Sequence, residues 1–169
     1  MVIPGRYGDA DVTIIGDKLF SGHDEITSVT IPDKITDMGE FIFDGCVNLK
    51  SIELPASLEN LWGATFVRCG LEEITLPDGL KTLPPYAFKE CQNLRKVVCG
   101  KGLKKIYSWV FAGCVNEIEI VKNGTVEVSP EAFAERTWQK VRPLVIRWGI
   151  RPGRKRIDCK EIVSSACTH

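Results

Sequence analysis

Residues 71–93 read LEEITLPDGLKTLPPYAFKECQN, and residues 94–116, directly after them, read LRKVVCGKGLKKIYSWVFAGCVN. Both blocks carry apolar residues, one Phe and a late Cys at matching places, and the pattern extends upstream to blocks 26–48 and 49–70. The spacing is clearest for the phenylalanines, which recur every 22 or 23 residues at Phe20, Phe43, Phe66, Phe88, Phe111 and Phe133. A fixed period of this length is typical of repeat proteins.

Most copies begin with L-x-x-I-x-L, as in residues 71–76, and this alternation predicts a short β-strand. The next residue is Pro32, Pro55 or Pro77, where proline blocks further ladder pairing, and the fourth copy has Cys99-Gly100 instead of Leu-Pro. A second apolar pair three residues apart, such as Leu80 and Leu83, then leads to the A-F-x-x-C segment. This latter half is typical of a 3₁₀ turn or a short strand that leads to a tight corner.

The ends of the array are less regular. A degenerate copy runs from Glu117 to about Arg136, and Val12, Ile15 and Phe20 supply the second half of an incomplete opening copy. Because one copy cannot bury its apolar edge alone, stacked copies must share a continuous core. The sequence therefore predicts a repeat solenoid of about five repeats.

These copies resemble the leucine-rich repeats of the bacterial BspA-like (Treponema-type) class, which read roughly L-x-x-I-x-L-P-x-x-L-x-x-I-x-x-x-A-F-x-x-C. The resemblance covers residues 12 to about 134; Cys99-Gly100, the loose fifth copy and the lack of any repeat after Gln139 depart from it. It implies an arc with a parallel β-sheet face and short 3₁₀ or strand segments on the other face. It also implies a non-catalytic role in protein recognition or bacterial adhesion.

The cysteines form a column three residues after the phenylalanines. Adjacent copies stack about 4.8 Å apart, so four sulfurs in a line cannot converge on a zinc ion, and parallel Cβ vectors would strain a disulfide. We expect a ladder of buried, reduced thiols, with His23 in the equivalent place at a half-buried corner. Cys159 and Cys167, outside the repeats, are the better candidates for a reactive pair. The column consists of Cys46, Cys69, Cys91 and Cys114.

The phenylalanine column is predicted to form a buried spine of stacked rings. Asn48, Asn93 and Asn116 follow the cysteines closely, and their amides are expected to bond to backbone at the corners.

Nothing in the sequence indicates an enzyme. The only histidines are His23 and His169, and no Gly-x-Ser-x-Gly, His-Glu-x-x-His or phosphate-loop pattern occurs. We therefore expect no catalytic residues, no metal site, no cofactor and no small-molecule substrate. A deep pocket that joins His23 to acidic residues would be needed to reopen that question.

The candidate binding residues are those that alternate with the buried Ile and Leu of each strand and so face outward. Acidic Glu72 and Glu73 are expected beside basic Arg95 and Lys96 of the next copy. The outward charges have two interpretations, which can both hold: cross-strand pairing that keeps an exposed sheet in solution, or recognition of a protein or peptide partner. The proposed face consists of Ser28, Thr30, Ser51, Glu53, Glu73, Thr75, Lys96 and Val98.

The formal net charge of zero conceals two opposed regions. Residues 1–135, the predicted solenoid, hold 13 basic and 20 acidic residues, whereas residues 136–169 hold nine basic and two acidic ones. The second region is predicted to be a terminal cap, with a strand where Leu144, Ile146, Trp148 and Ile150 alternate. The alternative is an interaction protein that binds nucleic acid or an anionic lipid surface through a basic patch. That patch comprises Arg151, Arg154, Lys155 and Arg156.

The sequence leaves the compartment open. The N-terminal residues show no signal-peptide pattern, and no apolar run approaches the roughly 20 residues of a transmembrane helix, which would suit a cytoplasmic chain. The odd number of cysteines, seven, argues mildly against a disulfide framework. The family resemblance instead implies secretion or the cell surface if the chain is part of a longer protein.

Overall fold

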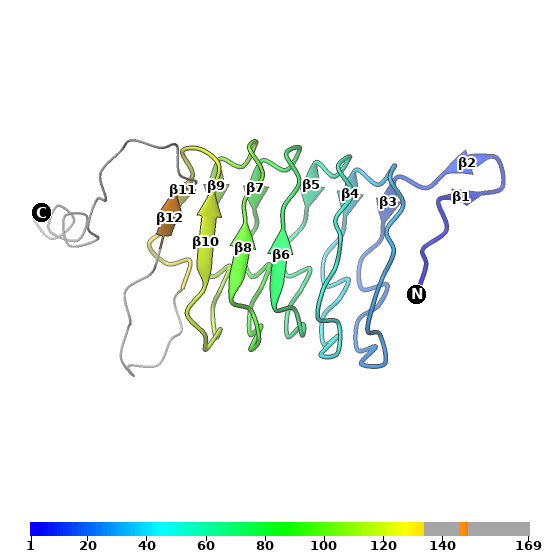
Figure 1. Ribbon diagram of the computed structural model, residues 1–169. Coiled ribbons are helices and arrows are strands. Elements are labelled where there is room, and N and C mark those ends of the chain that lie inside the picture. Colours follow the sequence, from blue (N-terminus) through cyan, green and yellow to red (C-terminus); the bar gives the residue numbers. More distant parts are fainter. Residues whose placement is uncertain (134–145, 149–169) are drawn as a thin grey trace, which may run out of the picture.

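The computed structural model describes residues 1–133 and the strand at 146–148. The chain winds into a solenoid in which each repeat makes one coil, and successive coils lie side by side along one axis (Figure 1). Each coil runs along one face, turns, returns along the opposite face and closes at a corner. The predicted solenoid of parallel strands is therefore confirmed.

One face carries a four-stranded parallel sheet in the order β12-β10-β8-β6. Its strands are β6 (Glu73–Thr75), β8 (Lys96–Val98), β10 (Glu119–Lys122) and β12 (Ile146–Trp148). Ile74 pairs in register with Val97, and Val97 with Ile120, so equivalent residues of successive repeats are neighbours. The strand predicted in the C-terminal region is confirmed as β12, which lies parallel to β10. We call this side of the solenoid the strand face.

The prediction of a regular strand in the earlier copies is wrong, because residues 26–31 and 49–54 form no named strand. Each neighbouring pair among residues 26–31, 49–54 and 71–76 has a proline after both segments, which removes a backbone donor from each partner. In the β6–β8 and β8–β10 pairs at least one segment is followed by Gly100 or Asn123 instead. Beyond the strands, the ladder continues through Leu76 N, which donates to Val98 O, and through Cys99 N, which donates to Val121 O, both at 2.8 Å.

The opposite face consists of short strands. The sequence predicted either a 3₁₀ turn or a short strand for this half of the repeat, and the short strand is correct. One parallel sheet contains β3 (Ile14–Ile15), β4 (Asp37–Met38) and β5 (Asn60–Leu61), and the other contains β7 (Thr82–Leu83), β9 (Lys105–Ile106) and β11 (Glu127–Val128). The break falls between β5 and β7. Elsewhere the residue after the strand donates to the preceding coil, as Trp62 N does to Met38 O, but Pro84 has no N–H to donate.

The N-terminal segment adds an element that the repeat pattern does not contain. The strands β1 (Arg6–Tyr7) and β2 (Ala10–Asp11) form an antiparallel hairpin, with Gly8 in the left-handed region at φ 60°. Before it, Ile3 N donates to Thr30 O at 3.1 Å and Thr30 N donates to Met1 O at 2.9 Å. Residues 1–3 thus run beside the first complete copy on the strand face.

The predicted phenylalanine spine is confirmed. Consecutive rings stack with centroids 5.0 to 5.9 Å apart along the whole column from Phe20 to Phe133. The four central rings, Phe43, Phe66, Phe88 and Phe111, are completely buried. The spine therefore links all coils into one continuous core.

The cysteine ladder is also buried and free of disulfides among the residues described. Three thiols donate to the phenylalanine carbonyl of the preceding coil: Cys46 Sγ to Phe20 O at 3.2 Å, Cys91 to Phe66 O at 2.9 Å, and Cys114 to Phe88 O at 3.1 Å. Cys69 instead donates to Leu49 O at 3.8 Å. The column thus fills the core and also satisfies backbone carbonyls at the corner. Cys159 and Cys167 lie outside the described residues.

Burial of the thiols predicts a loss of stability in alkali. It raises the pKa of Cys46 and Cys99 from 9.0 to about 11 and that of Cys69 to about 12. The unfolded chain releases these protons from about pH 9 while the folded chain keeps them. We expect the free energy of unfolding to hold its full value below pH 9 and to fall from pH 9 to pH 11 in urea titrations. A Cys69→Ala variant should show a shallower fall, and an identical slope in the variant would contradict this origin.

Candidate recognition surface

The strand face presents the predicted residues to solvent. In each copy the alternation is regular, as with exposed Ser28 and Thr30 around buried Val29, or exposed Glu73 and Thr75 around buried Ile74. Ser51 and Glu53 are likewise exposed, while Lys96 and Val98 are half-buried. The structure therefore brings all eight predicted residues to one side of the solenoid.

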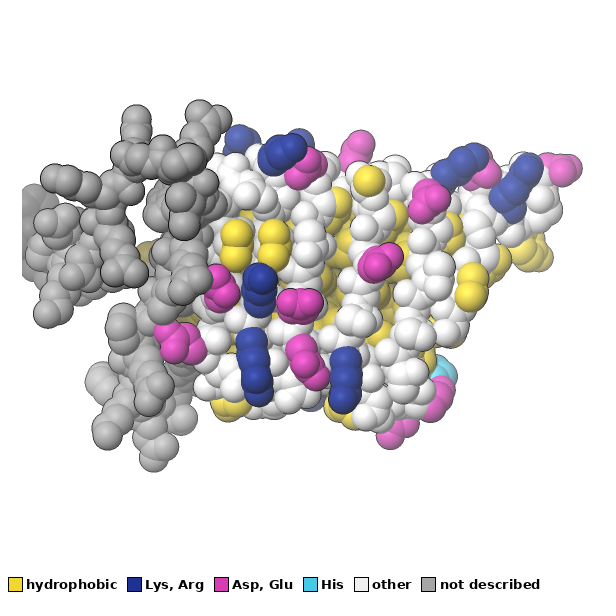
Figure 2. Space-filling model, viewed as in Figure 1, with side chains coloured by type: hydrophobic (Ala, Val, Ile, Leu, Met, Phe, Trp, Pro, Cys, Tyr) yellow, Lys and Arg dark blue, Asp and Glu magenta, His cyan; other side chains and the backbone are white. Residues whose placement is uncertain are grey.

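Charges of opposite sign alternate across this face. Glu73 is in register with Lys96, and Lys96 with Glu119, so the basic Lys96 lies between two acidic residues on the neighbouring strands. The predicted juxtaposition of acidic and basic copies is confirmed by this pairing and by Arg95 N, which donates to Glu72 O at 2.8 Å. Figure 2 shows basic and acidic side chains alternating from strand to strand over β6, β8 and β10.

Two residues of this surface escaped the sequence analysis. Glu119 and Val121 belong to the degenerate copy, and they extend the two rows that begin with Glu73 and Thr75. The row of Thr75, Val98 and Val121 is the less polar of the two, and the paired apolar side chains are visible beside the charged row in Figure 2. Adding the period of 23 residues to Lys96 and Val98 gives the positions of Glu119 and Val121.

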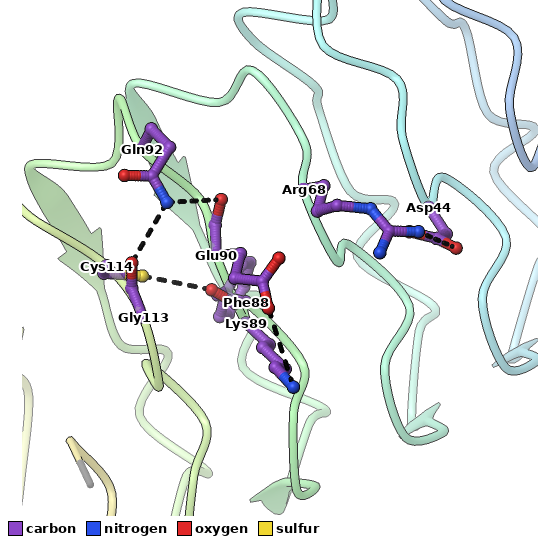
Figure 3. Close-up of polar contacts among 8 residues, drawn as sticks. All are labelled: Asp44, Arg68, Phe88, Lys89, Glu90, Gln92, Gly113 and Cys114. Carbon is purple, nitrogen blue, oxygen red and sulfur yellow. Dashed lines mark hydrogen bonds and ion pairs between the residues drawn. The ribbon is translucent and has the colours of Figure 1, made fainter. Parts of the chain in front are cut away.

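The corners hold the coils in register through backbone-directed side chains. Asn48 Nδ2 donates to Asp24 O at 2.8 Å and Asn116 Nδ2 to Gln92 O at 2.6 Å, which confirms the prediction for these two amides. Between the same two coils as Asn116 and Gln92, Gln92 Nε2 also donates to Gly113 O, and within its own coil to Glu90 O (Figure 3). For the third predicted amide, Asn93, no such bond is found within residues 1–133 and 146–148. These contacts tie the coil of Asp24 to that of Asn48 and the coil of Gln92 to that of Asn116, and together with the strand ladders they make the strand face a preformed surface.

A column of residues with left-handed backbone conformation lies at these corners. The residue two positions after each of Phe20, Phe43, Phe66, Phe88 and Phe111 has a left-handed backbone with φ between 51° and 79°; the column is Gly22, Gly45, Arg68, Glu90 and Gly113. Glycine adopts this conformation freely, whereas Arg68 and Glu90 adopt it at a cost. Arg68 also bonds Asp44 of the preceding coil, with Nη2 2.8 Å from Oδ1 (Figure 3).

His23 lies at the predicted corner but is more exposed than a buried member of the column, since the first coil has no earlier coil to cover it. Its side chain is 52% exposed, and Nδ1 lies 2.7 Å from Oε1 of Glu25. Both residues line an open depression of about 420 Å³ at the N-terminal end of the solenoid. The hydrogen bond from His23 lowers the pKa of Glu25, which keeps this carboxyl ionised. A lowered pKa is the opposite of what a general acid needs.

A metal site, the basic patch and a membrane-spanning helix are considered next. Residues 1–133 contain no group of three or more His, Cys, Asp or Glu side chains placed to hold a metal ion. The basic patch of Arg151, Arg154, Lys155 and Arg156 lies outside the described residues. The part of the chain that the structure describes also contains no helix of the length and apolar character that a membrane span requires.

Comparison with known proteins places this geometry in a family. Residues 13–138 match the model of the BspA type leucine rich repeat region in six copies. No curated protein matches the sequence of the chain.

Solved structures share the fold. A leucine-rich repeat protein of T. pallidum is 28% identical with a TM-score of 0.65, over 72% of this chain and 57% of that one. A leucine-rich repeat protein of Bacteroides ovatus is 25% identical with a TM-score of 0.56, over 79% of this chain and 42% of its own. A leucine rich cell surface protein of Faecalibacterium prausnitzii has 22% identity and a TM-score of 0.50, over 79% and 44% of the two chains. The chain thus corresponds to roughly half of each of these proteins.

Proposed function

Because the chain belongs to the family of BspA-type leucine-rich repeat proteins, we propose that its strand face recognises a protein or peptide partner. Members of this family are generally non-catalytic repeat proteins. The pair of His23 and Glu25 is an exposed surface contact, which agrees with a binding role for the chain. The proposed face is the set of eight residues predicted from the sequence, extended by Glu119 and Val121.

The observation that carries the proposal is the alternation of charge across adjacent strands. Glu73, Lys96 and Glu119 form a row of fixed order, beside the less polar row of Thr75, Val98 and Val121. A partner with complementary charges in the same order gains specificity, since any shift by one strand brings like charges together. The backbone of the face is held by ladder and corner hydrogen bonds, so binding requires little reorganisation.

We further propose that this partner recognition takes place at the cell surface or outside the cell. The F. prausnitzii structure with this fold is described as a leucine rich cell surface protein. A surface or secreted location would give the strand face access to extracellular proteins, as adhesion requires.

A charge-reversal variant of the strand face tests this function. In a pull-down quantified by mass spectrometry, we expect the proteins captured by the wild-type chain to be absent from the eluate of one triple variant. That variant is Glu53→Arg, Glu73→Arg, Lys96→Glu. The matched control is Glu40→Arg, Glu59→Arg, Lys104→Glu, which makes the same change of net charge at exposed residues of the coil outside the strand face. Equal capture by the wild type and the strand-face variant would refute the proposal, as would equal losses in both variants.

A further inference from the structure

Two pairs of charged residues with opposite sign lie side by side on the strand face. Glu72 and Glu73 belong to the segment of β6, and Arg95 and Lys96 belong to the equivalent segment of β8. Glu73 is in register with Lys96, and Arg95 N donates to Glu72 O at 2.8 Å, so the two pairs hold the same place in adjacent coils. We call Glu72 and Glu73 the acidic band, and Arg95 and Lys96 the basic band.

The charges of both bands are available to a partner. Glu72, Glu73 and Arg95 are exposed, and Lys96 is half-buried. Within residues 1–133 and 146–148, none of their side chains forms an ion pair or a hydrogen bond. Figure 2 shows the basic band over β8 beside the acidic band over β6, both visible on this side of the molecule.

A surface with one acidic and one basic band can be complementary to itself. Two identical chains that meet face to face are related by a twofold axis between their surfaces, and their contacts are reciprocal. If this axis runs parallel to the strands, midway between β6 and β8, the acidic band of each chain faces the basic band of the other. If the axis instead runs along the solenoid, each coil faces its own copy and like charges meet. The order of the charges therefore favours the first arrangement, in which the two solenoids are antiparallel.

The same arrangement matches the row beside the bands. A twofold axis parallel to the strands preserves the position along each strand, so Thr75 of one chain faces Val98 of the other. Thr75 and Val98 are in register within each chain, which places their methyl groups together next to the charged bands. Because the coils stack along one axis (Figure 1), two antiparallel solenoids can stay in contact over several coils.

We propose that the partner of the strand face is a second copy of this chain, bound as a symmetric antiparallel dimer through the acidic and basic bands. The inference rests on the proposed role of the strand face in protein recognition and names the protein that is recognised. Glu72 meets Arg95 of the other chain, and Glu73 meets Lys96 of the other chain. A shift of the two chains by one coil brings like charges together, so the charges also fix the register of the dimer.

Sedimentation velocity of the full chain over a range of concentrations tests the dimer. We expect a monomer–dimer equilibrium that weakens as sodium chloride is added, because salt screens the charges. The variant Glu72→Lys, Glu73→Lys carries two basic bands and should dimerise at least about tenfold more weakly, because like charges now face each other. The variant Arg95→Glu, Lys96→Glu carries two acidic bands and should show the same loss.

Mixing the two variants separates a lost contact from a lost fold. In a mixed dimer the basic bands of one variant face the acidic bands of the other on both sides of the axis. We therefore expect the mixture to dimerise under conditions in which each variant alone is a monomer. A chain with all the charges of both bands reversed should dimerise with itself again, since its bands are complementary once more. Circular dichroism melting curves check that each variant folds.

Cross-linking locates the contact between the chains. A carbodiimide joins a carboxylate directly to an amine, and a mixture of isotope-labelled and unlabelled chains distinguishes links between chains from links within one chain. We expect Glu73 of one chain to be linked to Lys96 of the other. The control variant Glu40→Arg, Glu59→Arg, Lys104→Glu reverses exposed charges outside the strand face and should dimerise like the wild type.

Three results would overturn the dimer: a wild-type chain that sediments as a monomer at every concentration, a mixture of the two variants that stays monomeric, or links between chains that lie only outside the strand face. The pull-down separates this failure from that of the proposed function. A monomeric chain that still captures other proteins through the strand face keeps the recognition role without the dimer. A monomeric chain that captures nothing loses both.

Discussion

Replacement of Phe88 by alanine is expected to lower the free energy of unfolding by about 3–5 kcal/mol. Phe88 is completely buried and stacks on Phe66 at 5.4 Å and on Phe111 at 5.9 Å. Removing its ring would leave a cavity in the middle of the spine, and two neighbouring rings would lose a stacking partner. Because the spine connects the coils, the loss should affect the whole unfolding transition. Urea denaturation followed by circular dichroism measures it.

The control for this variant is an apolar truncation of an exposed side chain. Val115 is 70% exposed, and Val115→Ala should change stability by no more than about 0.5 kcal/mol. If Phe88→Ala unfolds at the same urea concentration as Val115→Ala, the continuous phenylalanine core is the wrong description of the fold.

Substitution of Gly100 by alanine is expected to cost about 2–3 kcal/mol, a large effect for the addition of one methyl group. A Cβ atom at Gly100 would overlap the carbonyl group of Pro77 and would lie 2.8 Å from the amide nitrogen of Asp78. Both obstacles are backbone atoms of the preceding coil, so a side-chain movement cannot relieve them. The glycine that interrupts the Leu-Pro pattern therefore permits the close approach of two coils.

Gly124 provides a matched comparison for Gly100. No heavy atom lies within 4 Å of the Cβ that Gly124→Ala would add, and its backbone is not in the left-handed region. The melting temperature should fall clearly for Gly100→Ala and should hardly change for Gly124→Ala. Similar melting temperatures for the two variants would mean that the coils are less tightly stacked at Pro77 than the structure indicates.

The repeat pattern was sufficient to predict the features that depend on core periodicity. Phe66 and Cys91 occupy their predicted columns because stacked coils must bury the same positions, and Ile74 alternates with outward Glu73 and Thr75 because a strand has a period of two. The placement of the candidate binding residues on one face follows from the same rule. Their role does not, because an outward charge such as Lys96 can serve solubility, recognition or both.

The features that were missed depend on hydrogen bonding between coils. Residues 26–31 and 49–54 carry the strand pattern and yet form no strand. The sheet on the opposite face breaks at Pro84, which has no N–H to donate to the preceding coil. The left-handed corner column could have been found from Gly22, Gly45 and Gly113, but Arg68 and Glu90 interrupt the glycines. The hairpin of β1 and β2 falls outside the repeat, so the period carried no information about it.

We propose the strand face as the contact surface for a protein partner. Covalent labelling of carboxylates and amines, with and without a partner captured by the wild-type chain, locates that contact directly. We expect Glu53, Glu73 and Lys96 to lose reactivity in the complex and Glu40, Glu59 and Lys104 to keep theirs. Protection of the second set, with the strand face still fully reactive, would contradict it.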